Sequence, residues 1–124
     1  MAVCQEFGIE SRVIPRIASC FGGGIGNTGS VCGAVIGAVM SIGLKMEQSK
    51  SLEDWFRKAA VAQEFRRRFE AEMGTISCRE LTGADLTEEK ELEKLMNSDI
   101  PRTVCFPAVG IAYQLVVNLL NENP

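Results

Sequence analysis

The stretch 22–44 reads GGGIGNTGSVCGAVIGAVMSIGL, and it decides the fold of this 124-residue chain. Its first eight residues form a glycine-rich loop, because glycine adopts the positive φ angles of tight turns without steric cost. The segment 31–44 is apolar and lacks the alternation of a strand, which predicts a helix. At 14 residues this helix is too short to cross a bilayer. The stretch therefore predicts two helices joined by a tight connection.

The rest of the chain has helical spacing interrupted by turn residues, and no run of period-two alternation. We therefore expect an all-α protein, a small bundle of five or six helices with the glycine-rich loop between the second and third. The other expected helices are 2–7 (ended by Gly8), 12–21 (capped by Ser11), one from Ser51 to Gly74, 88–97, and a last helix that starts between Pro101 and Pro107.

Capping boxes mark two helix starts. Ser51 with Asp54 opens the long helix, and Ser77 with Glu80 opens a short turn that Gly83 closes. Several apolar residues at helical spacing are expected to face the core. They are Leu52, Trp55, Phe56, Ala59, Ala62, Phe65, Phe69 and Met73 on the long helix, and Leu92, Leu95 and Met96 on 88–97. We expect 31–44 and 108–120 to form the most buried pair.

Composition excludes several function classes. A length of 124 residues with 46% apolar content predicts a single domain, 1–124. The net charge of −3 gives no electrostatic basis for binding nucleic acid or an anionic membrane. The chain contains no histidine, which removes Ser-His-Asp catalysis and the haem attachment motif. With no leader visible, we expect a cytoplasmic protein with reduced thiols, and no membrane span, because polar residues and Pro107 interrupt the apolar segment 103–120.

The glycine-rich loop contains a formal GxGxxG, at Gly24, Gly26 and Gly29. A dinucleotide site also needs a strand before this motif. Residues 12–17 read as helix, so NAD binding is not expected. A tight connection between helices explains the glycines, and a second interpretation is that its backbone N–H groups hold an anion or a cluster sulfur.

Small residues recur every four positions in the next segment, at Gly29, Gly33, Gly37 and Ser41. Each glycine inside a helix costs about 1 kcal/mol relative to alanine. Such a groove indicates that something approaches the backbone closely, which is another helix, a cofactor or a partner subunit.

Three of the five cysteines fall at predicted helix starts, namely Cys32, Cys78 and Cys105. The positive end of a helix dipole lowers the pKa of a thiol. Cys4 and Cys20 lack this setting. The alternative is that each cysteine is a small buried residue without chemistry.

Together these motifs resemble the C_GCAxxG_C_C family of redox-active proteins. The resemblance rests on the CGAxxG sequence at 32–37, on residues 21–24 before it, on the segment 77–83 and on Cys105. The resemblance implies a small helical protein with four characteristic cysteines and with oxidoreductase or transporter proteins as partners. Cys32, Cys78 and Cys105 match the second to fourth of these cysteines. The first lies upstream of this chain's start in the family, so the N-terminal helix is interpreted as truncated and Cys4 is not its equivalent.

Two function classes follow. In the first, Cys32, Cys78 and Cys105 converge as thiolates, either for disulfide and electron-transfer chemistry or to ligate an iron–sulfur cluster or zinc. A fourth ligand would come from Cys4, Cys20, a carboxylate or a partner chain. Such a protein is an oxidoreductase or an electron-transfer accessory protein. In the second class, the chain is a non-catalytic interaction module that uses the Gly29, Gly33 and Gly37 groove. A homodimer is expected in either class, because the truncated helix leaves an apolar face uncovered.

Overall fold

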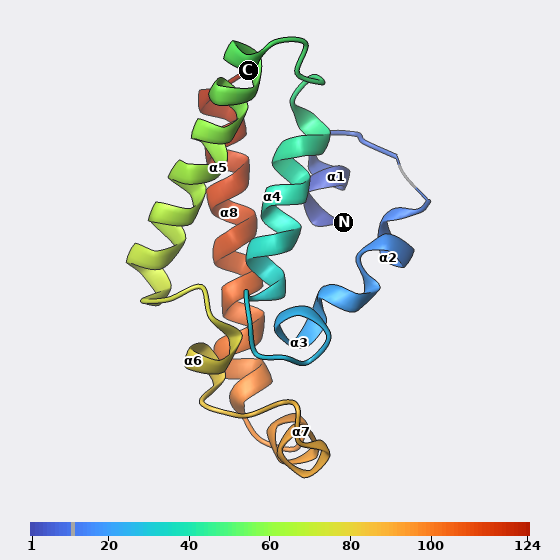
Figure 1. The fold of residues 1–124 in the computed structure, drawn as a ribbon, viewed down its shortest axis with the longest axis vertical. Helices are drawn as coiled ribbons and strands as arrows, with labels where there is room; N and C mark the ends of the chain where they lie inside the picture. Colours follow the sequence, from blue (N-terminus) through green and yellow to red (C-terminus); the bar gives the residue numbers. More distant parts are fainter. Residues whose placement is uncertain (11) are drawn as a thin grey trace.

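The computed structural model describes residues 1–10 and 12–124, and these residues are all-α, as predicted (Figure 1). The elements are α1 (Ala2–Glu6), α2 (Ile14–Ile17), the 3₁₀ turn η1 (Ser19–Phe21), α3 (Gly22–Ile25), α4 (Gly33–Lys45), α5 (Leu52–Met73), α6 (Cys78–Thr82), α7 (Glu89–Met96), the π-turn η2 (Pro101–Cys105) and α8 (Phe106–Glu122).

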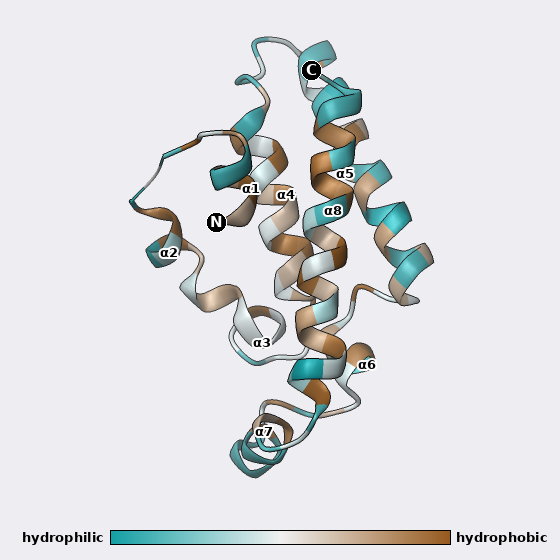
Figure 2. Ribbon diagram, turned by 180° about the vertical axis from the view of Figure 1, so that it is seen from behind, coloured by the Kyte–Doolittle hydropathy of each residue, from teal (hydrophilic) through white to brown (hydrophobic). Residues whose placement is uncertain are grey.

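Helices α4, α5 and α8 lie side by side and enclose the core (Figure 1). Helix α1 packs against α8. Fully buried side chains come from all three helices: Ile42 of α4, Phe65 and Phe69 of α5, and Val116 and Leu119 of α8. Burying each of these contributes about 1.5–3 kcal/mol. Polar residues cover the outer face of α5, whereas α4 and α8 are mostly apolar (Figure 2). The expected packing of 31–44 against 108–120 is confirmed, because α4 and α8 lie in contact.

The two predicted N-caps are confirmed. The Ser51 hydroxyl accepts a hydrogen bond from the Asp54 N–H at 3.1 Å, and the Ser77 hydroxyl accepts one from the Glu80 N–H at 3.2 Å. Gly74 and Gly83 end α5 and α6 in the left-handed conformation, where glycine has no steric cost. These local signals position α6, which carries one of the site cysteines.

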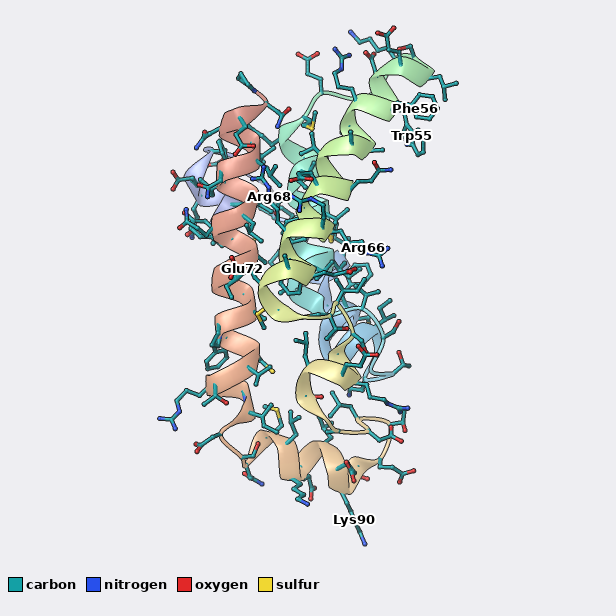
Figure 3. The ribbon with its side chains drawn as sticks, turned by 90° about the vertical axis from the view of Figure 1, so that its left-hand side faces the viewer. Trp55, Phe56, Arg66, Arg68, Glu72 and Lys90 are labelled. Carbon is teal, nitrogen blue, oxygen red and sulfur yellow. The ribbon has the colours of Figure 1, made fainter. Side chains whose placement is uncertain are left out.

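The predicted buried stripe of α5 is wrong at its start. Leu52, Trp55 and Phe56 are 68%, 55% and 58% exposed, although they share helical spacing with the buried Phe69. In Figure 3 the first turns of α5, with Trp55 and Phe56, lean away from α8. Helix α8 ends at Glu122, so it offers no further side chains to cover these turns. Met96, also expected inside, is 63% exposed at the end of α7.

The helix predicted over 12–21 is broken into α2 and η1. Only Ile14 of α2 is buried, and a short helix without a packed face is unstable in water. The capping role predicted for Ser11 lies outside the described residues. The third helix also starts later than predicted, at Gly33, with Cys32 as its N-cap.

The glycine-rich loop forms a left-handed turn. Every residue from Gly23 to Asn27 has a positive φ, between 59° and 71°. Three of these five residues are glycines, which adopt a positive φ without steric cost. Ile25 and Asn27 carry side chains and adopt it at a steric cost. The tight positive-φ connection is therefore confirmed, and no strand precedes it among the described residues, so the loop lacks the setting of a dinucleotide site.

The last helix starts with a π-turn, η2, within the predicted window. The N–H of Phe106 donates to the carbonyl of Pro101, five residues earlier. Pro107 has no N–H, and its ring clashes with the carbonyl four residues before it, so the helix widens there. As a result Cys105 lies one turn inside a continuous helix, and the prediction that it occupies the first turn is wrong.

By length and composition, one stretch of the described chain would suffice to span a membrane, the continuous helix Pro101–Glu122. Its residues Ala108, Ala112, Val116, Leu119 and Leu120 are core residues of the bundle. A core helix of this kind passes the same test, so the helix gives weak support for a membrane span.

An ion cluster ties α5 to the end of α8. Arg67 and Arg68 donate to the Glu64 carboxylate, and Arg68 also donates to Glu122 at 3.2 Å. The hydrogen bonds from Arg67, and then those from Arg68, lower the pKa of Glu64 from 4.5 to about 2. The charged carboxylate therefore stabilises the folded chain above pH 4.5, and this contribution is lost as the pH falls to about 2.

We expect Glu64→Gln to flatten the fall in melting temperature over that interval of pH. Thermal unfolding followed by circular dichroism between pH 6 and 2 measures the effect, which exposure to solvent keeps small. The matched control is Glu72→Gln, at an exposed position of the same helix (Figure 3). Equal pH profiles for the two variants would contradict the role given to the cluster.

Candidate functional site: a cavity lined by three cysteines

A short antiparallel bridge positions two of the cysteines. Val31 pairs with Ser77, the Cys32 N–H donates to the carbonyl of Ile76 at 2.7 Å, and the Cys78 N–H donates to the carbonyl of Ser30 at 2.7 Å. Side chains alternate along paired segments, so Cys32 and Cys78 both project from the face opposite Val31 and Ser77. Their positions are diagonal across the bridge, where Cα atoms are about 7–8 Å apart.

The left-handed turn is the surface on which Cys78 packs. A Cβ atom on Gly24 would lie 2.6 Å from the Cβ of Cys78 and 2.6 Å from the backbone nitrogen of Ser30. A Cβ on Gly29 would lie 3.1 Å from the Cβ of Arg79. Only a residue without a side chain allows α6 to approach this closely, so the glycines are required for the position of Cys78.

The third cysteine reaches the same place from η2, which lies against α6. Cys32, Cys78 and Cys105 line one cavity of about 380 Å³. Its walls come from the glycine-rich turn and from the starts or ends of four helices: Gly23, Gly24, Asn27, Gly33, Ala34, Leu81, Thr82, Leu86, Leu92, Leu95, Met96, Pro101, Val104, Phe106, Ala108 and Val109. None of the described residues in this wall is charged.

The remaining cysteines do not line this cavity. Cys4 is buried in α1, and Cys20 is exposed in η1, where its sulfur lies 3.9 Å from the Ser19 hydroxyl. All five cysteines are free thiols in this structure. Cys32, Cys78 and Cys105 thus line one cavity that Cys4 and Cys20 do not line, and their role as a site stays a prediction.

The electrostatics differ from the prediction that these thiols have lowered pKa values. Burial raises the pKa of Cys78, and the neighbouring Cys32 and Cys105 raise it further. Burial, followed by the charge of Cys32, also raises the pKa of Cys105. The apolar wall thus outweighs the helix dipole, which is weak for the five-residue α6 and absent at Cys105, inside a helix. Both thiols are protonated at neutral pH.

The structure also bears on metal ligation. Within residues 1–10 and 12–124, no group of three or more cysteine or carboxylate side chains is close enough together to hold a metal ion. The three thiols share one cavity without forming such a group, and their role as metal ligands stays a prediction.

The glycines predicted to bind a cofactor divide into three groups. Gly24 and Gly33 line the cysteine cavity, and Gly29 packs against Arg79. A Cβ on Gly26 or Gly37 would have no heavy atom within 4 Å. Gly37 lines a second cavity, of about 210 Å³, between α1, α4 and α8, together with Gly33 and Ser41.

Sequence reasoning missed part of the cavity wall. Thr82 is buried and its hydroxyl donates to the carbonyl of Cys78 at 2.8 Å, which fixes the first turn of α6. Phe106 and Val109 lie at the cavity although their helix is mostly a core element. Pro107 was the available signal for the π-turn that brings these residues and Cys105 to the cavity.

Residues 1–119 match a family described as "Putative redox-active protein (C_GCAxxG_C_C)". No curated protein and no solved structure matches the chain. With nearly its whole length matched, and with the CGAxxG cysteine, Cys78 and Cys105 around one cavity, the chain belongs to the C_GCAxxG_C_C family.

Proposed function

We propose that the chain is a cytoplasmic dithiol redox protein, in which two of the three cavity thiols are reversibly oxidised to a disulfide. In this step two S–H bonds break and one S–S bond forms. Two electrons and two protons pass to an oxidant, such as the disulfide of a partner protein, which is reduced to two thiols. The single observation that carries the proposal is that Cys32, Cys78 and Cys105, from three separate segments, line one cavity.

One further observation supports disulfide chemistry. Neutral thiols suit the uncharged wall, whereas three thiolates without a metal would repel one another. Cys78 is the most buried of the three, and both of the others act on its pKa, so we place it in the disulfide.

Cysteine variants test this proposal. After treatment with diamide, the reduced wild-type chain is expected to lose two titratable thiols, and Cys78→Ser is expected to lose none within the cavity. The matched control is Cys20→Ser, which alters an exposed thiol outside the cavity and is expected to oxidise like the wild type.

Two results would overturn the proposal. One is unchanged oxidation of Cys78→Ser. The other is stoichiometric iron, sulfide or zinc in anaerobically purified protein that disappears in Cys32→Ser, which would establish the metal alternative.

A homodimer is a further part of the proposal. Leu52, Trp55 and Phe56 form an exposed apolar face at the start of α5, where a second copy would bury apolar area. An oxidoreductase or transporter-associated protein remains the proposed redox partner, on the basis of the resemblance to the family.

A further inference from the structure

The cysteine cavity opens to solvent through an apolar rim. Met96, Phe106 and Val109 all line the cavity and are 63%, 68% and 56% exposed. A side chain that lines a cavity and is more than half exposed lies where the cavity meets solvent. Single exposed apolar side chains are ordinary, but three that line the same cavity make its exposed edge apolar. An apolar edge favours an apolar ligand.

The wall of the cavity restricts the charge of that ligand. With no charged side chain among the described wall residues, a carboxylate or phosphate inside the cavity would lose its water without gaining a counter-charge. Dinucleotides are therefore poor occupants. A volume of about 380 Å³ lies in the range of small-molecule sites. The occupant is thus neutral and about the size of one or two rings.

The depth of the thiols identifies where such a ligand would react. Cys78 is 8% exposed and lines the cavity, so an oxidant reaches its sulfur by entering the cavity. Burial also raises the pKa of Cys78 and Cys105, which shows that the cavity disfavours charge. A reaction that moves protons together with electrons leaves every group neutral.

We propose that the cavity binds a neutral, apolar two-electron oxidant of the quinone class, which accepts the electrons of the cavity thiols. This inference rests on the proposed dithiol function and names its electron acceptor. One thiol adds to the quinone ring, so that an S–C bond forms and the thiol proton moves to a quinone oxygen. A second thiol attacks the first sulfur, an S–S bond forms, and the S–C electron pair returns to the ring. The second proton goes to the other oxygen, and the products are one disulfide and one hydroquinone.

Anaerobic oxidation of the reduced full chain by duroquinone tests this proposal. The ring of duroquinone is fully methylated, so a stable thioether does not replace the disulfide. We expect hydroquinone and disulfide in equal amounts, with a rate that saturates as duroquinone increases. Val109→Asp, which places a carboxylate at the rim, is expected to lower the rate about tenfold or more below saturation.

The matched control is Val39→Asp, which changes an exposed valine of α4 outside the cavity wall and is expected to oxidise at the wild-type rate. If Val109→Asp does not fold, Phe106→Ala with Phe56→Ala as its control makes the same comparison. Diamide separates this inference from the function on which it rests. A disulfide formed with diamide but not with duroquinone, or equal duroquinone rates in all variants, would overturn the quinone site alone. No disulfide with either oxidant would overturn both proposals.

Discussion

Gly24→Ala is expected to destabilise the chain by about 2–5 kcal/mol and to remove dithiol oxidation. Two effects combine. At φ +71° an alanine costs about 1–2 kcal/mol, and the overpacking adds about 1–3 kcal/mol. The new Cβ would meet the backbone of Ser30 and the Cβ of Cys78 at 2.6 Å, so relief requires α6 to move. Urea unfolding and diamide oxidation measure the two consequences.

The matched control is Gly26→Ala. Gly26 has φ +59°, yet its Cβ would have no heavy atom within 4 Å. This variant is therefore expected to lose only about 1–2 kcal/mol and to keep dithiol oxidation. If the two alanine variants lose equal stability and both keep oxidation, the close approach of the turn to Cys78 does not position the site.

Phe69→Ala is expected to lower the free energy of unfolding by about 3–5 kcal/mol, because it opens a cavity at a fully buried position between α5 and its neighbours. Phe56→Ala on the same helix removes the same ring from a position that is 58% exposed. At protein concentrations low enough to dissociate the proposed homodimer, a loss within about 0.5 kcal/mol is expected there. Urea denaturation of both variants measures the difference, and a comparable loss at Phe56 would show that the first turns of α5 are covered in solution.

Local sequence signals predicted much of the fold. Ser51, Ser77, Gly74 and Gly83 mark helix ends through hydrogen bonds and φ angles that involve only near neighbours, so they can be recognised without the tertiary structure. The all-α class followed from the same short-range periodicity.

Features that depend on tertiary packing were not predictable in this way. Trp55 and Phe56 share the spacing of Phe69, and their exposure depends on where α8 ends. Spacing along one helix carries no information about the length of its neighbour. The tight positive-φ turn was predicted, but the close approach of α6 to Gly24 depends on tertiary packing.

The sequence singled out the three cysteines that line the cavity, but not the direction of the pKa shifts of Cys78 and Cys105. Cys32, Cys78 and Cys105 meet because a bridge joins the starts of α4 and α6 and a π-turn presents Cys105. Helix starts were the reason for expecting reactive thiols, but the direction of the pKa shift depends on burial, which three-dimensional packing determines.

The measurement that tests the central claim most directly is mass-spectrometric mapping of the disulfide formed when the fully reduced wild-type chain is oxidised by diamide. The claim that Cys32, Cys78 and Cys105 form one redox site predicts a single intramolecular disulfide between Cys78 and either Cys32 or Cys105, with Cys4 and Cys20 still alkylated as thiols. A disulfide that contains Cys4 or Cys20, or three cavity cysteines that remain reduced after Cys20 has reacted, would contradict it.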